Sequence, residues 1–126
     1  MREALAPIRR RLDRLGIALS GLCAVHCLAG IALVSFFGLG SLAGESLFAP
    51  VIHRVGLALA VAVAALTLGI AALRHRRRGP LAVGALGIVL MLAGLFAPHG
   101  PGEALLTIPG VLLVALAHVR NMRLIA

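Results

Sequence analysis

Long uncharged stretches alternate with short charged clusters along this chain. The uncharged intervals, with histidine counted as neutral, are 15–44, 55–73, 79–102 and 104–119, with lengths of 30, 19, 24 and 16 residues. A helix rises 1.5 Å per residue and needs about 20 apolar residues to cross roughly 30 Å of hydrocarbon. Three intervals meet that length. The fourth reaches it because the stems of Arg120 and Arg123 extend along the helix toward the interface.

The pattern predicts an all-α protein, an integral membrane four-helix bundle that forms one domain over residues 1–126. The predicted spans are about 16–38, 54–73, 80–97 and 104–120. Glycine and proline are concentrated in the three connections, and Gly79-Pro80 places proline in the first turn of the third span. Pro109 lies inside the fourth span, where membrane helices tolerate a kink.

Composition supports a membrane protein. Of 126 residues, 61% are apolar and 13% are charged, whereas soluble domains are about 45–50% apolar and about a quarter charged. A chain this short lacks the volume to bury so large an apolar share. An ordinary soluble domain, a disordered chain and a disulfide-stapled scaffold are therefore excluded.

The net charge of +8 comes from twelve basic residues, all arginine, against four acids. Eleven arginines lie in the groups 2–14, 74–78 and 120–123, and only Arg54 belongs to the other side. The positive-inside rule then places both termini and the 74–80 connection in the cytoplasm. Because the arginines are segregated between apolar stretches, we predict no nucleic-acid partner.

The basic N-terminus is followed by an apolar run that is too long for a cleaved signal peptide. Two other interpretations of the N-terminal segment are open. Leu5, Ile8, Leu12 and Leu15 fall at helical spacing opposite most arginines. This favours an amphipathic interfacial helix leading into the first span. A solvated basic tail is the alternative.

The first span contains Cys23, His26 and Cys27, including both cysteines of the protein. At 100° per residue, all three project from one helical face. Small residues continue that face as a stripe of Gly16, Ser20, Cys23, Cys27 and Gly30, which is typical of packing against other helices. We therefore expect the three side chains to point into the bundle, where ionisable groups are costly and indicate function.

Geometry favours metal binding by the cysteines over a disulfide. Cβ atoms four residues apart on a helix are about 5–6 Å apart, whereas a disulfide needs roughly 3.8 Å. Two thiolates holding one ion need sulfurs about 4.6 Å apart, at roughly 2.3 Å per bond. Thiolates select soft ions such as Cu⁺ and Hg²⁺. His26 is a third ligand or a proton acceptor for the thiols. The alternative is that the cysteines only pack as small apolar groups.

Four further residues are weaker candidates. His53, beside Arg54 at the outer end of the second span, collects metal or anchors the interface. His118 lies near the inner end of the fourth span, some 10 Å shallower than Cys23; it is a second metal station, a proton acceptor or a structural residue. Met91 is a soft ligand or plain packing. Glu103 pairs with Arg54 near the outer interface or, as we expect, lies in water at the start of the fourth helix.

The layout resembles the MerC-domain family of small four-span membrane proteins. The resemblance covers about residues 14–124 and is carried by four segments: Arg14-Leu15-Gly16 leading to Leu22-Cys23-Ala24-Val25-His26-Cys27-Leu28, His53-Arg54, Arg74-His75-Arg76-Arg77-Arg78, and Ala117-His118-Val119-Arg120-Asn121-Met122-Arg123-Leu124. It implies a multi-pass protein of the bacterial inner membrane that takes up mercuric ion and passes it to the cytoplasm. The implied ligands are Cys23 and Cys27.

No nucleotide-binding or nucleophile motif occurs, so we predict no enzyme and no permanently bound cofactor. The predicted partners are the lipid bilayer, a transported soft metal ion (Hg²⁺ or Cu⁺) and a cytosolic thiol acceptor. Association into a homo-oligomer is left open. A thiol-redox membrane protein and a structural or assembly subunit are the alternative functions.

Overall fold

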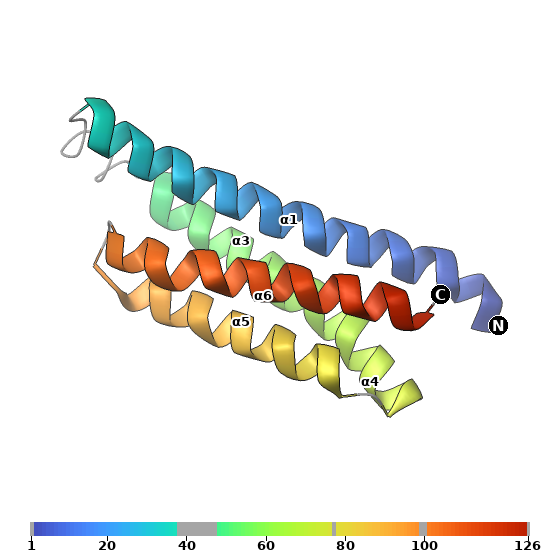
Figure 1. Cartoon of the computed structure of the whole chain (residues 1–126). Coiled ribbons are helices and arrows are strands. Elements are labelled where there is room, and N and C mark those ends of the chain that lie inside the picture. Colours follow the sequence, from blue (N-terminus) through green and yellow to red (C-terminus); the bar gives the residue numbers. More distant parts are fainter. Residues whose placement is uncertain (1, 38–47, 77, 99–100, 126) are drawn as a thin grey trace.

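The computed structural model describes residues 2–37, 48–76, 78–98 and 101–125, and these ranges contain helices and no strand. The elements are α1 (Arg2–Phe37), α3 (Phe48–Ala64), the π-helical segment η1 (Ala65–Gly69), α4 (Ile70–His75), α5 (Gly79–Phe96) and α6 (Pro101–Ile125) (Figure 1). The prediction of an all-α fold is confirmed.

Four stretches of the described helices are long and apolar enough to cross a membrane: Ala4–Gly30, Arg54–Arg74, Gly79–Phe96 and Gly102–Leu124. Large apolar side chains on their outer faces are exposed, among them Leu22, Leu73, Phe96 and Leu105. In water such exposure would be unfavourable, but in a bilayer these side chains face acyl chains. The four-helix membrane architecture predicted from the charge pattern is therefore confirmed.

The helices form an elongated bundle in which α1 lies along α6 and α3, while α5 lies along α6. Both termini and the turn after α4 lie at the same end of the bundle (Figure 1). The three arginine groups therefore share one end, as the charge pattern predicted. Which side of the membrane this end faces stays a prediction.

The N-terminal segment continues directly into the first span, and α1 is a single helix of 36 residues. The helical interpretation of this segment is confirmed, and the placement of its apolar face at the membrane interface stays a prediction. Ile8 and Leu15 are exposed, whereas Asp13 is fully buried, because Asp13 finds hydrogen-bond partners on α6.

The connection between α4 and α5 has proline where the sequence predicted it. Arg76 ends α4 in the left-handed region with φ of 51°, and α5 begins at Gly79 with Pro80 in its first turn, as predicted. Pro109 lies within α6, as predicted for the fourth span.

Helices α5 and α6 approach closely through facing glycines. A Cβ added at Gly87 would lie 2.6 Å from the carbonyl oxygen of Gly110, and one at Gly110 would lie 2.7 Å from that of Gly87. Only glycine permits backbones this close, which is a common way for membrane helices to associate.

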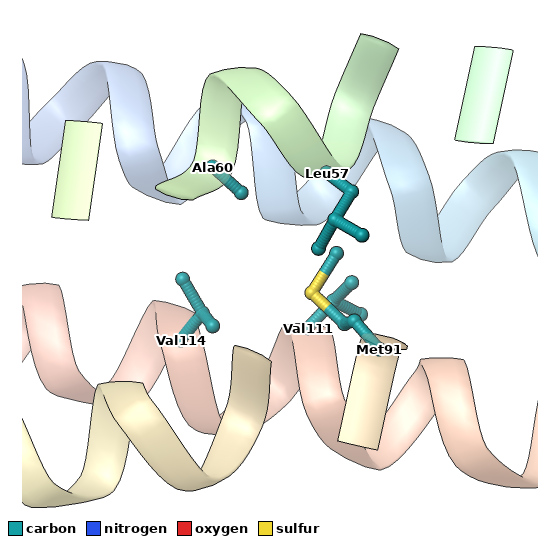
Figure 2. Packing of buried hydrophobic residues seen from close by; sticks show 5 residues of the cluster. All are labelled: Leu57, Ala60, Met91, Val111 and Val114. Atoms are coloured by element: carbon teal, nitrogen blue, oxygen red, sulfur yellow. The ribbon is translucent and has the colours of Figure 1, made fainter. Parts of the chain in front are cut away.

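The apolar core lies where α3, α5 and α6 meet. Its buried residues are Leu57, Ala60, Met91, Val111 and Val114, whose side chains face one another in Figure 2. Cys23 and Ala24 of α1 pack against this cluster. Met91 is thus part of the core, one of the two roles expected for it.

Candidate functional site

The two cysteines lie on the face of α1 that turns toward the other helices. Cys27 is buried with 9% of its surface exposed, and Cys23 is half-buried. A Cβ added at Gly56 of α3 would lie 3.3 Å from Cys23 Sγ. The missing side chain of Gly56 therefore leaves room for the sulfur of Cys23 between α1 and α3.

The predicted small-residue stripe is confirmed over four of its five positions. Gly16, Ser20 and Cys27 are buried and Cys23 is half-buried. Gly30 is exposed, and a Cβ added there would meet no atom within 4 Å. The stripe prediction is therefore wrong at Gly30.

Cys23 and Cys27 form no disulfide. Uninterrupted helix runs through both residues, so their Cβ atoms have the i,i+4 separation of about 5–6 Å. This separation suits two sulfurs on opposite sides of one soft ion and opposes a direct sulfur–sulfur bond.

Within the described ranges, no three side chains from His, Cys, Asp and Glu are grouped so that they could hold a metal ion. His26 is half-buried beside Cys27. Two sulfurs are sufficient for an ion that prefers linear coordination, so a site formed by Cys23 and Cys27 alone stays a prediction. The two roles expected for His26, third ligand and proton acceptor, stay predictions.

Glu103 departs from the expectation of a solvated acid. It lies in the first turn of α6, as predicted, but only 8% of its surface is exposed. It is also close enough to Cys27 for the two groups to interact electrostatically. The expectation failed because α1, α3 and α5 pack around the start of α6, which the sequence pattern did not reveal.

A small cavity lies beside this carboxylate, lined by Leu57, Met91, Leu95, Glu103 and Thr107. Its volume of about 10 Å³ approximates the space needed for one water molecule. The cavity therefore has room for about one water molecule beside Glu103.

A second polar cluster lies toward the end of the bundle that holds the termini. His118 Nδ1 is 2.7 Å from Asp13 Oδ1, and Asn121 Nδ2 donates to both carboxylate oxygens at 3.2 and 2.9 Å. Thr67 Oγ1 donates to the carbonyl of Val63 at 2.8 Å and lies 3.4 Å from His118 Nδ1. Asp13 and His118 are completely buried, and Asn121 and Thr67 are each 1% exposed. The cluster joins α1, α6 and η1.

The ring of His118 lies directly against the backbone of Gly16. A Cβ added there would lie 2.4 Å from His118 Nε2. Within the described part of the chain, this nitrogen is buried and has no hydrogen-bond partner.

Sequence reasoning identified His118 but missed Asp13. The available signal was the spacing of His118 and Asn121, which places both on one face of a helix. Asp13 was hidden among arginines, and its partners lie 105 and 108 residues away.

The remaining histidine candidate, His53, lies in α3, but its side chain is outside the described part of the structure. His53 therefore stays a prediction.

The fold and the position of the two cysteines define a multi-pass membrane protein with two thiols on an inward face. The family model described as "MerC mercury resistance protein" matches residues 13–123, most of the chain. The chain therefore belongs to the MerC family, a transport-type family of mercury resistance and not an enzyme family. No curated protein and no solved structure matches the chain.

Proposed function

We propose that this protein carries mercuric ion across the bacterial inner membrane into the cytoplasm, with Cys23 and Cys27 as its two ligands. The observation that carries the proposal is the inward position of the pair. Cys27 is buried and the sulfur of Cys23 faces Gly56. In a chain of the mercury-resistance family, this pair offers two soft ligands within the membrane.

Binding converts both thiols to thiolates, so each ion that enters as Hg²⁺ displaces two protons. Two thiols of a cytosolic acceptor then replace the cysteines on the ion, and their protons return to Cys23 and Cys27. The exchange conserves charge and involves no oxidation. An excess of cytosolic thiol supplies the direction.

The histidines have subsidiary roles in this proposal. His26 is a third ligand during exchange or a local proton acceptor, and His53 collects the ion at the outer end of the second span. His118 is not among the proposed ligands, because Asp13 holds its ring about 10 Å along α1 from Cys23.

The test is accumulation of mercury by cells that express the chain. Cys23→Ser and Cys27→Ser each remove one sulfur, and we expect accumulation to fall to the level of cells without the protein. Ala24→Ser is the matched control, because it adds a hydroxyl on the same turn and keeps both thiols. Equal accumulation in the parent and both cysteine variants would refute the proposal.

Competition among Hg²⁺, Cu⁺ and Zn²⁺ for the purified protein tests the identity of the ion. We expect Hg²⁺ to displace Zn²⁺, since a two-sulfur site cannot complete the tetrahedral coordination that Zn²⁺ prefers. Tighter binding of Cu⁺ than of Hg²⁺ would transfer the proposal to copper.

A further inference from the structure

The cluster of Asp13, His118, Asn121 and Thr67 has the arrangement of a buried proton-binding site. His118 Nδ1 lies 2.7 Å from Asp13 Oδ1, and a hydrogen carried on Nδ1 can be donated to that oxygen. In the neutral ring, Nε2 is then a lone-pair acceptor. A proton added at Nε2 makes an imidazolium that is already paired with the carboxylate, which is the condition for burying charge.

The surroundings of Nε2 fit a proton better than a metal ion. The ring lies so close to Gly16 that even a methyl group would have to displace it. A metal–nitrogen bond is about 2.0–2.1 Å long, and the ion would need further ligands. The described ranges hold no such group of His, Cys, Asp and Glu side chains.

The same stripe of α1 connects this cluster with the thiol pair. Gly16 lies against His118, and Cys23 follows seven residues later, about 10 Å along the axis. Ser20 lies between them, is 6% exposed and donates to the carbonyl of Gly16 at 2.9 Å. Ser20 is thus about one helical turn from both Gly16 and Cys23.

Most other charged side chains near this end of the bundle are exposed and lie outside the cluster. Arg9 precedes Asp13 by one turn and has Nε and Nη2 buried, without a hydrogen-bond partner in the described structure. The exposed arginines on the neighbouring segments of α1, α4 and α6 are Arg10, Arg11, Arg14, Arg74, Arg120 and Arg123. Neither α5 nor η1 carries a titratable side chain.

We propose that His118, held by Asp13, binds one of the two protons that leave Cys23 and Cys27 when the metal ion binds. This proposal rests on the proposed function of the thiol pair. In balance, two S–H bonds break and two sulfur–metal bonds form; one proton bonds to Nε2 and the other leaves for water. When cytosolic thiols remove the ion, their protons restore the cysteines and the proton on Nε2 is released.

The experiment counts the protons released when Hg²⁺ saturates the purified full-length protein in weakly buffered detergent near neutral pH. We expect about one proton per ion from the parent and about two from His118→Gln and Asp13→Asn. Gly21→Ala is the control, because a Cβ there meets no atom within 4 Å and the change leaves the cluster intact. It should release about one.

Each outcome decides between the two proposals. Equal proton counts in the parent and His118→Gln, with mercury bound in both, overturn the role of His118 and leave the thiol site intact. Mercury bound equally well by Cys23→Ser/Cys27→Ser overturns the thiol site and, with it, the proton site.

A measurement on the unaltered protein guards against variants that fail to fold. Nitrogen NMR of the labelled imidazoles should show His118 change from neutral ring to imidazolium when Hg²⁺ is added. An unchanged ring, or coupling of Nε2 to mercury, would overturn the proposal.

Discussion

Replacing Gly16 by alanine tests whether the buried cluster has the packing described above. The new Cβ would lie 2.4, 2.6 and 2.7 Å from Nε2, Cδ2 and Cε1 of His118. These atoms belong to a stiff ring that is completely buried and bonded to Asp13 at 2.7 Å. The ring must therefore move, and the movement weakens its hydrogen bond.

Two costs add in this variant. Forcing an extra methyl group into a well-packed site costs about 1–3 kcal/mol. Weakening a hydrogen bond to a buried charged group costs up to about 1.5–3 kcal/mol more. We expect the free energy of unfolding to fall by about 3 kcal/mol, which lowers the ratio of folded to unfolded protein by roughly 100-fold.

Denaturation by SDS, followed by far-ultraviolet circular dichroism in mixed micelles, measures the change. Gly21→Ala is the control, because a Cβ there meets no atom within 4 Å. Adding His118→Ala to Gly16→Ala removes the clashing ring, so the double variant should lose less stability than the sum of the single variants. If Gly16→Ala unfolds at the same midpoint as Gly21→Ala, the packing of His118 against α1 is refuted.

Two further glycine variants probe other helix contacts. Gly87→Ala places a Cβ 2.6 Å from the Gly110 carbonyl, so α5 and α6 must separate; we expect a loss of about 1–3 kcal/mol in the same SDS assay, and an unchanged midpoint would contradict the contact. Gly56→Val adds methyl groups where a Cβ is already 3.3 Å from Cys23 Sγ. We expect weaker Hg²⁺ binding in a titration of purified protein. An unchanged affinity would contradict the close contact between Gly56 and the sulfur of Cys23.

The inward face of the thiol pair could be predicted because helical periodicity is a local property. Once residues 15–44 were assigned to a helix, the spacing of Ser20, Cys23 and Cys27 determined that they share a face. Their partners could not be predicted in this way. That Cys23 faces Gly56, and that Glu103 lies close to Cys27, depends on the positions of separate helices.

Asp13 shows the same limit more sharply. Arginines lie close to it in sequence at positions 9–11 and 14, and nothing in the local pattern marked Asp13 as buried. It is buried because His118 and Asn121 of α6 satisfy its carboxylate inside the bundle. A charged residue can be buried when its hydrogen bonds are supplied by a distant segment.

The membrane-spanning helices could be predicted from the sequence alone, because lipid insertion depends on the length and polarity of each segment. The shared face of the cysteines could also be predicted, because it follows from helical spacing. The pairing of Asp13 with His118 and the burial of Glu103 arose only when the helices packed. Such contacts depend on how helices cross and rotate against one another, and those variables are set by the whole bundle rather than by any one stretch of chain.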